Sequence, residues 1–295
     1  MNRVHELLLI CMKILVTGGT GFIGRHLVNK LLLLGHEVVV LADETKGNPP
    51  EGSEYIKGDI RDGYNVKKAF EGCECVFHLA AITDVRDSND EAVYATNFLG
   101  SKNVFEVAKA KNAKIIFTST AAVYGNGNIP NREMDECKPI SQYGKSKLRA
   151  EWYLQNLVQD SFIVRLFNVY GTGGHSFINV LAEKMPKYDD ISIFGNGLQT
   201  RDYVHVDDVL DALLLGFNNS GLYNVGTGVE CSTSRLVEVA QEITKYKPNL
   251  KFTPPKKNDI ARNRADITKI KSIGWEPKMS LEEGIKSMFH EAEKK

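Results

Sequence analysis

A tyrosine and a lysine stand four positions apart in the segment Tyr143-Gly144-Lys145-Ser146-Lys147. On a helix, positions i and i+4 lie on one face, so the Tyr143 phenol and the Lys147 ammonium can converge. A free phenol has a pKa of about 10, and a fixed ammonium beside it favours the phenolate and lowers that pKa. The pair therefore predicts a base that removes a hydroxyl proton. Taken alone, the spacing also fits a solvated helix without chemistry.

A glycine-rich segment follows an apolar run and opens a helical pattern, with glycines at Gly18, Gly21 and Gly24. Where side chains are missing, the backbone can approach a pyrophosphate, and the helix N-terminus supplies N–H groups and the positive end of its dipole. A plain strand–helix turn needs only one glycine. Three glycines at this spacing, in this strand–turn–helix context, predict dinucleotide binding.

Polar residues follow three further strand-like runs. Asp43 is expected to bind the adenosine ribose hydroxyls, and its charge would repel a 2′-phosphate, which favours NAD over NADP. Asp59 is expected to reach the adenine; a solvated carboxylate at a strand end is the alternative for both. Thr120 is expected to hydrogen-bond the reacting oxygen, because ligands of open α/β sheets bind beyond the carboxyl ends of strands. Ser119 is the weaker candidate, with satisfaction of backbone groups as its alternative role.

The elements that must position these residues are visible in the first half of the chain. Short β-rich runs (13–17, 37–41, 54–57, 75–78, 114–119 and 162–166) alternate with helical patterns (22–34, 66–70, 97–111 and 143–159). Such alternation predicts βαβ units and a parallel sheet, and the unbroken apolar run of residues 38–41 indicates a strand covered on both faces. We predict an α/β protein: a Rossmann-type doubly wound parallel sheet with a smaller C-terminal α/β substrate lobe.

The predicted dinucleotide-binding domain spans residues 12–168, and residues 169–295 are mainly the substrate lobe, with about 204–220 returning to the first domain. Residues 1–11 are interpreted as an extension or a mis-called start.

Composition excludes several classes of function. Lys+Arg and Asp+Glu both number 37, and a chain without basic excess is a poor candidate for nucleic-acid binding. No apolar run reaches the roughly 18 residues that cross a bilayer, so no membrane partner is expected. The five cysteines are odd in number and scattered, which indicates reduced thiols in a cytoplasmic protein. Cys73 and Cys75 lack a second cysteine pair, so no metal site is predicted.

Together, these residues resemble the extended short-chain dehydrogenase/reductase family, specifically its nucleotide-sugar epimerases. The family order of motifs is present from the glycine loop through Asp43, Asp59-Ile60, His78-Leu79-Ala80-Ala81 and Ser119-Thr120 to Tyr143 and Lys147. In the second half, residues 165–171 resemble the family's R-x-F-N-x-Y-G, and residues 194–208 resemble its G-x-G-x-Q-x-R-D-Y-V-H-V-D-D. The resemblance extends over nearly the whole chain.

The resemblance implies NAD as cofactor and a nucleotide-diphosphate sugar, most often a UDP-hexose, as substrate. Tyr143 would take the proton of the 4-hydroxyl with the help of Thr120, while Lys147 holds the nicotinamide ribose. The C4 hydride would pass to the nicotinamide and return to the other face of the 4-keto sugar. The implied cofactor-binding residues are Gly18, Gly21, Phe22, Ile23, Gly24, Asp43, Asp59, Ile60, Leu79, Ala80, Ala81, Asn97, Ser119, Tyr143 and Lys147. The implied substrate-binding residues are Thr83, Thr120, Asn168, Arg201, Lys256 and Asp259, and His78 is expected to be structural.

The residues after Thr120 distinguish reactions within the family. Dehydratases and decarboxylases place acidic residues there, whereas this chain has Ala121 and Ala122. A UDP-glucose/UDP-galactose 4-epimerase is therefore predicted. A dehydratase, a 4-ketoreductase, another nucleotide-sugar epimerase and a non-catalytic NAD-binding scaffold or sensor remain the alternatives.

Relatives dimerise through the helices that correspond to residues 97–111 and 143–159, so a homodimer is expected, although core packing should account for most of their apolar residues. The chain departs from the family in three places. Ala42 stands where an aspartate is usual, Lys256 stands near the place of a second phosphate-binding arginine, and the segment between Gly171 and Phe177 is short, which implies a trimmed substrate lobe. In addition, the small Asn263 stands near the place of a bulky residue. The last difference hints at tolerance for N-acetylated sugars.

Overall fold

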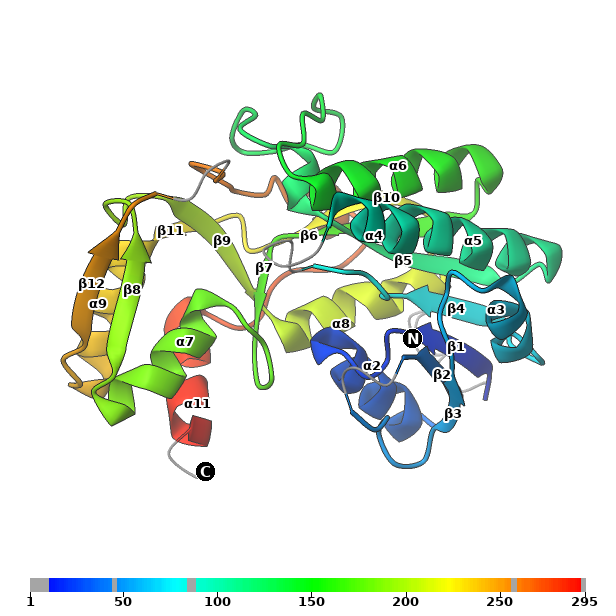
Figure 1. Ribbon diagram of the computed structural model, residues 1–295, viewed down its shortest axis with the longest axis horizontal. Coiled ribbons are helices and arrows are strands. Elements are labelled where there is room, and N and C mark those ends of the chain that lie inside the picture. The colour runs from blue at the N-terminus through cyan, green and yellow to red at the C-terminus, as the bar shows by residue number, and fades with distance from the viewer. Residues whose placement is uncertain (1–10, 44–46, 84–88, 256–258, 293–295) are drawn as a thin grey trace. The chain divides into compact units, whose positions relative to one another are not determined.

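The computed structural model describes residues 11–43, 47–83, 89–255 and 259–292 (Figure 1). The prediction for residues 1–11 therefore lies almost wholly outside the described residues. The chain divides into two compact units. Unit 1 comprises residues 1–123, 141–165 and 210–223, and unit 2 comprises residues 124–140, 166–209 and 224–295.

Unit 1 is built on a seven-stranded sheet, which confirms the predicted fold class. Its strands run in the order β10-β6-β5-β4-β1-β2-β3. Their bounds are β1 Lys13–Thr17, β2 Glu37–Ala42, β3 Glu54–Lys57, β4 Cys75–His78, β5 Lys114–Thr120, β6 Ser161–Leu166 and β10 Gly221–Val225. β1 pairs in parallel with both β2 and β4. The strand order therefore reverses beside β1, where open α/β sheets bind their ligands.

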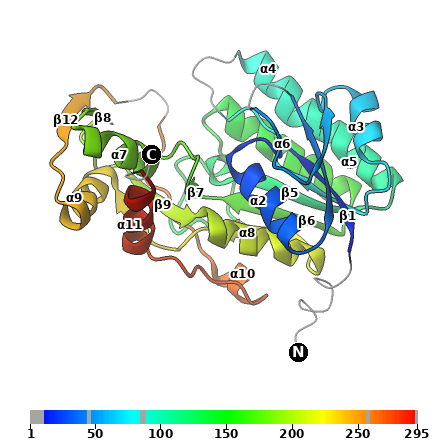
Figure 2. The same cartoon turned by 90° about the horizontal axis from the view of Figure 1, so that it is seen from below.

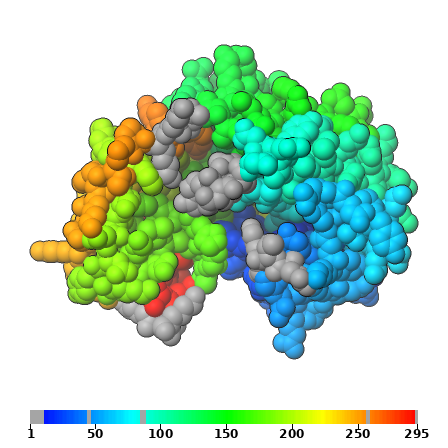
Figure 3. Space-filling model, in the orientation of Figure 1, coloured from blue at the N-terminus to red at the C-terminus, as the bar shows by residue number. Residues whose placement is uncertain are grey.

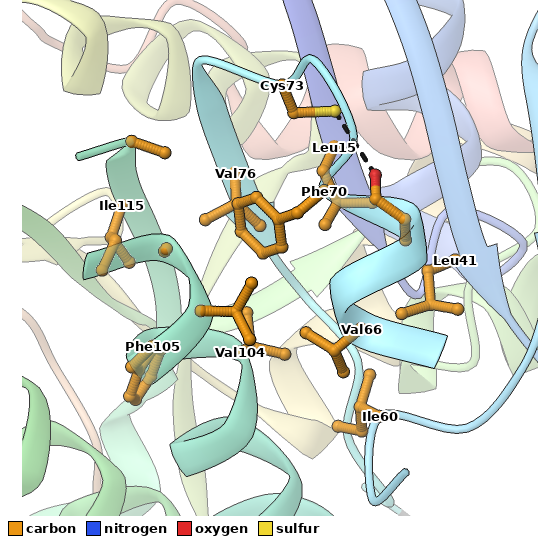
Figure 4. Close-up of a cluster of buried hydrophobic side chains, with 14 of the residues drawn as sticks. Leu15, Leu41, Ile60, Val66, Phe70, Cys73, Val76, Val104, Phe105 and Ile115 are labelled. Carbon is orange, nitrogen blue, oxygen red and sulfur yellow. Dashed lines mark hydrogen bonds between the residues drawn. The ribbon is translucent and has the colours of Figure 1, made fainter. Parts of the chain in front are cut away.

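Helices cover both faces of this sheet (Figures 1 and 2). Their bounds are α2 Phe22–Leu33, α3 Gly63–Ala69, α4 Asp90–Tyr94, a π-helical turn η2 Ala95–Gly100, α5 Ser101–Ala110, α6 Gln142–Leu157 and α8 Val206–Leu214. Leu15 of β1 points into the core cluster beneath α3, α5 and α6, which Figure 4 shows with Val66 and Val104. Because side chains alternate along a strand, Ile14 and Val16 point to the opposite face, on which α2 lies.

Two predicted helices begin earlier than the apolar pattern indicated. α3 begins at Gly63 because the Asp62 side chain accepts a hydrogen bond from Tyr64 N. The helix predicted over residues 97–111 begins at Asp90, capped by Asn89, and contains a π-helical turn in its middle. Polar capping residues therefore set starts that hydrophobic periodicity does not reveal.

Unit 2 contains a three-stranded sheet, a two-stranded sheet and short helices. The strands are β7 Asn168–Tyr170, β8 Asp190–Phe194, β9 Thr200–His205, β11 Glu230–Ser232 and β12 Asn249–Thr253. They pair in the orders β11-β9-β7 and β12-β8, and β12 reaches the surface (orange in Figure 3). The helices are α7 Phe177–Lys184, α9 Thr233–Thr244, α10 Thr268–Lys271 and α11 Leu281–Ala292, and α7, α9 and α11 share one apolar core.

The unit boundaries differ from the domain limits drawn on the sequence. Residues 124–140 group with unit 2 because Asn131 bridges to Ala265 and donates its N–H to Arg264 O at 2.7 Å. The segment that returns to unit 1 is 210–223. Among the described residues, no helix is long and apolar enough to cross a membrane.

Candidate active site

The glycine loop after β1 is too tightly folded to accept side chains at its first and last glycines. Gly18 has a φ of +73°, and a Cβ there would lie 2.8 Å from the Ala80 backbone nitrogen. A Cβ at Gly24 would collide with the carbonyl oxygen of Gly18. The neighbouring segment is held by β1, since Thr17 O accepts from Leu79 N at 3.1 Å and Thr17 Oγ1 accepts from Ala80 N at 3.3 Å. Leu79 and Ala80 therefore lie beside the loop, and the cofactor contacts expected of them and of Ala81 stay predictions.

The start of α2 fits an anionic ligand. Within the described part of the chain, no side chain caps this helix, and its first turn, which includes Phe22 and Ile23, carries no acidic residue. The free N–H groups and the positive end of the dipole are thus left for an anion. Loop and helix start together fit the pyrophosphate of a dinucleotide.

The two predicted adenosine-binding acids differ in environment. Asp43 is the first residue after β2 and is exposed. Asp59 accepts hydrogen bonds from Arg61 N and Nε, both at 2.8 Å. Burial alone raises the pKa of Asp59, but the Arg61 contacts outweigh it, so the pKa lies below its usual value. Ile60 is buried against Gly100, and both acid roles stay predictions.

Asn97 lies in the π-helical turn and is fully buried. Its Oδ1 accepts from Ile82 N at 2.7 Å, and its Nδ2 donates to Ile82 O at 2.9 Å and to Ser146 Oγ at 3.1 Å. The amide thus ties the segment after β4 to α6, one residue before Lys147, and π-helical turns are frequent at functional sites. Its predicted contact with the cofactor stays a prediction, and Thr83, just after Ile82, is exposed.

Tyr143 and Lys147 occupy the first turns of α6, whose N-cap Ser141 accepts from Gly144 N at 3.1 Å. Burial raises the pKa of Tyr143 to about 12, and a hydrogen bond with Thr120 acts in the opposite direction. Lys147 is buried, with Nζ 4.2 Å from the centre of the Phe117 ring. Burial lowers the pKa of Lys147 to about 7, and the Glu151 charge opposes this.

The pKa of the Tyr143 phenol is therefore raised, whereas the sequence predicts that Lys147 lowers it. Both residues lie in α6, as the spacing predicts, and the convergence of the phenol and the ammonium stays a prediction. The electrostatics differ because burial disfavours both the phenolate and the ammonium.

Sequence reasoning missed two buried charged residues close to Lys147, Glu151 and Arg165. Glu151 has no exposed side-chain surface and accepts hydrogen bonds from Ser119 Oγ and from Arg165, whose Nη2 lies 2.7 Å from Glu151 Oε2. Two signals pointed to them. Glu151 stands one helical turn after Lys147, and Arg165 is a charge inside an otherwise apolar strand.

His78 makes contacts that agree with the structural role expected for it. Its Nδ1 lies 2.6 Å from Thr17 Oγ1 and its Nε2 lies 2.8 Å from Ser101 Oγ. Burial lowers the pKa of His78, and the nearby Lys147 adds to this.

In unit 2, the structure brings together two of the predicted substrate-binding residues. Arg201 of β9 donates from Nη2 to Asp259 Oδ1 at 2.7 Å. Asn168, in β7, is opposite Tyr203 in the sheet register and is half-buried. Asp259 also lines a pocket of about 390 Å³ with Phe194, Gln199, Arg262 and six other residues. Lys256 lies outside the described residues.

The neighbouring Asp202 is buried and organises the segment around Arg201. Its carboxylate accepts from Thr227 N at 2.7 Å, Gly228 N at 2.9 Å and Ala265 N at 3.0 Å. The Asp202 carboxylate thereby anchors two loops to the strand that carries Arg201. Asn263 is also buried. Among the residues that the structure describes, no group of three or more potential metal ligands occurs.

The chain was compared with known families and proteins. Residues 14–226 match the model of the NAD dependent epimerase/dehydratase family. A putative UDP-glucose 4-epimerase from Methanocaldococcus jannaschii is 37% identical, over 94% of this chain and 97% of its own length. At 28% identity, a UDP-N-acetyl-alpha-D-glucosaminuronate decarboxylase from Bacillus cytotoxicus matches 92% of this chain and 95% of its own length.

Solved structures are similar over almost the full chain. The UDP-glucose 4-epimerase of Thermotoga maritima, solved with UDP-glucose, superimposes with a TM-score of 0.91 at 35% identity and covers 96% of this chain and 99% of its own. The UDP-glucose 4-epimerase of Thermus thermophilus, solved with NAD, has a TM-score of 0.89 at 32% identity, with the same coverage of 96% and 99%.

Proposed function

The chain belongs to the NAD dependent epimerase/dehydratase family, and on this premise we propose that it inverts C4 of a UDP-hexose, interconverting UDP-glucose and UDP-galactose. The observation that carries the proposal is the Tyr143 side chain, hydrogen-bonded to Thr120 and one turn from the buried Lys147. The expected cytoplasmic location, drawn from the scattered cysteines, is part of the same proposal.

Each residue of this group has a role in the proposed reaction. NAD, when bound on the glycine loop, supplies the acceptor and donor of a hydride. Tyr143 accepts the proton of the sugar hydroxyl and later returns it. Thr120 orients the hydroxyl by hydrogen bonding, and Lys147 in its ammonium form stabilises the phenolate.

The two alanines after Thr120 favour epimerisation over the other reactions of the family. Ala121 and Ala122 form a short 3₁₀ turn, residues 121–123, directly after β5. Their methyl groups can neither donate nor accept a proton. Eliminating water needs an acid and a base at the sugar, so a reversible oxidation at C4 is the reaction that this residue set supports.

We assign the binding of the substrate diphosphate in unit 2 to Arg201. Its guanidinium matches phosphate oxygens in geometry as well as charge. Asp259 would hold this guanidinium in place until the diphosphate replaces the carboxylate as its partner. Asn168, Thr83 and Lys256 complete the proposed set of substrate-binding residues.

The experiment is to incubate the purified protein with UDP-galactose, with and without added NAD, and to follow UDP-glucose by chromatography. The wild type is expected to interconvert the two sugars, and Tyr143→Phe is expected to do so far more slowly. Lack of interconversion of every UDP-hexose tested, UDP-N-acetylglucosamine included, would contradict the proposal. Release of a 4-keto sugar with net reduction of the added NAD would indicate a 4-ketoreductase running in reverse, and equal inactivity of both proteins would indicate a non-catalytic scaffold.

We also propose a homodimer formed through α5 and α6. Val104 and Ala108 are fully buried in the core of unit 1 and Val107 nearly so, as expected for most apolar residues of these helices. Trp152 of α6 and Leu99 of the π-helical turn are 56% and 44% exposed. Exposed apolar side chains mark an interaction site where they form a continuous patch, and we propose that Trp152 and Leu99 belong to one.

A further inference from the structure

Glu151, one helical turn after Lys147, is a buried carboxylic acid that the proposed reaction does not use. Glu151 stands four positions after Lys147 on α6, so both side chains emerge from the same face of the helix. Glu151 is fully buried, and Lys147 is 1% exposed. Residues from two strands, Ser119 of β5 and Arg165 of β6, close around its carboxylate.

The Glu151 carboxylate is held by charged and polar donors on both of its oxygens. Arg165 Nε lies 3.1 Å and 3.2 Å from the two carboxylate oxygens, and Arg165 Nη2 lies 2.7 Å from Oε2. Ser119 Oγ donates to Oε1. The side chains of Arg165 and Glu151 are 4% and 0% exposed, and a buried charge persists only when it is paired and hydrogen-bonded in this way.

Opposing influences act on the charge of Lys147. Its ammonium lies over the Phe117 ring, which favours the cation, but burial favours the neutral amine. Two titratable groups interact with its charge, Glu151 on α6 and His78 on β4. Arg165 on β6 pairs with Glu151, and Tyr143 stands one helical turn before Lys147 on α6. Glu151 is the member of this set whose charge stabilises the ammonium.

We propose that Glu151 is a positioning residue that keeps Lys147 protonated against Phe117, so that Tyr143 can act as a base. The inference rests on the proposed function only for the role of Tyr143. The Arg165 and Ser119 contacts fix the carboxylate on the Lys147 side of α6. Without this negative charge, Lys147 loses its proton at lower pH, and the Tyr143 phenolate loses its neighbouring cation.

The test uses the NAD-loaded protein and Glu151→Gln, which keeps the size of the side chain and removes its charge. Because an adjacent opposite charge shifts a pKa by about 1–3 units, the alkaline fall in interconversion should begin about 1–3 pH units lower. A second readout needs no sugar: the ultraviolet absorbance of the phenolate, taken as the difference from Tyr143→Phe. In Glu151→Gln, this phenolate signal should be weaker near neutral pH, where Lys147 keeps its proton in the wild type but not in the variant.

Two variants control the experiment. Asp160→Asn removes an exposed carboxylate, ion-paired with Lys114 in the same unit, and should leave both titrations unchanged. The double variant Glu151→Gln/Arg165→Met avoids an unpaired buried guanidinium, so it gives the answer if the single variant does not fold. Glu151→Asp, which retains the charge, should restore most of the wild-type pH profile.

Equal loss of activity at every pH, with an unchanged phenolate titration, would overturn the proposal and make Glu151 a purely structural residue. If the wild type interconverts no sugar but its phenolate titration depends on Glu151, the proposed function fails and this inference stands.

Discussion

Each unit of the molecule holds an arginine–carboxylate pair at the same separation of 2.7 Å, in different surroundings. In unit 1, the side chains of Arg165 and Glu151 are 4% and 0% exposed. In unit 2, those of Arg201 and Asp259 are 16% and 37% exposed. A buried pair is a fixed part of the scaffold, because separating it leaves a charge without water. A partly exposed pair can exchange partners, which suits an arginine that must bind a substrate phosphate.

The largest effect should come from the base itself. Removing a positioned acid–base group costs about 10²–10⁴-fold in rate. Tyr143→Phe should therefore lower kcat for UDP-galactose by about that factor, while NAD binding, measured by calorimetry, stays within a few-fold. A matched control is Tyr64→Phe on α3, an exposed phenol of the same unit that should keep full activity. Substantial activity of Tyr143→Phe would show that another group removes the proton.

Breaking the two ion pairs should affect stability very differently. Arg165→Met leaves the Glu151 carboxylate buried and unpaired and should lower the free energy of unfolding by about 3–5 kcal/mol. Arg201→Met removes a partly exposed pair and should cost less than about 1 kcal/mol. Denaturant unfolding of both variants measures the difference. Similar losses in the two variants would contradict the distinction between a fixed and an exchangeable pair.

A lysine in place of Arg201 tests whether the forked geometry of the guanidinium matters in unit 2. Arg201→Lys keeps the charge but loses bidentate binding of phosphate oxygens. A hydrogen bond to a charged group contributes about 1.5–3 kcal/mol, so KM for the UDP-sugar should rise about tenfold or more. Initial-rate kinetics test this, with kcat expected to change little. An unchanged KM would remove Arg201 from the proposed substrate site.

These regions also differ in how much of them the sequence could predict. Local spacing fixes the geometry of two pairs of residues. The glycines Gly18 and Gly24 belong to one turn, and Tyr143 and Lys147 belong to one helix. The parallel strands were equally predictable from apolar runs, because strands covered on both faces need them. The sheet order in turn places the ends of β1, β4 and β5 side by side.

Contacts between distant segments were not predictable in this way. Arg165 reaches Glu151 across two elements, and no local pattern links them. The grouping of residues 124–140 with unit 2 depends on backbone hydrogen bonds between Asn131 and the 264–266 segment. The raised pKa of Tyr143 follows from burial, which spacing alone does not reveal.

The smallest effect on the reaction should come from the exposed apolar face of unit 1. Trp152→Glu places a charge where 56% of the tryptophan surface is exposed. It should shift the protein from dimer to monomer in sedimentation experiments, with the rate per subunit changed less than a few-fold. A wild type that sediments as a monomer at every concentration would contradict the proposed homodimer.

The most direct test of the account follows one hydrogen atom through the reaction. UDP-galactose carrying deuterium at C4 is converted by the enzyme in ordinary water, and the UDP-glucose formed is analysed by mass spectrometry and NMR. Because Tyr143 handles only the hydroxyl proton, the account predicts that deuterium remains on C4 of the product. Deuterium lost to water, or none of the sugar inverted, would contradict it.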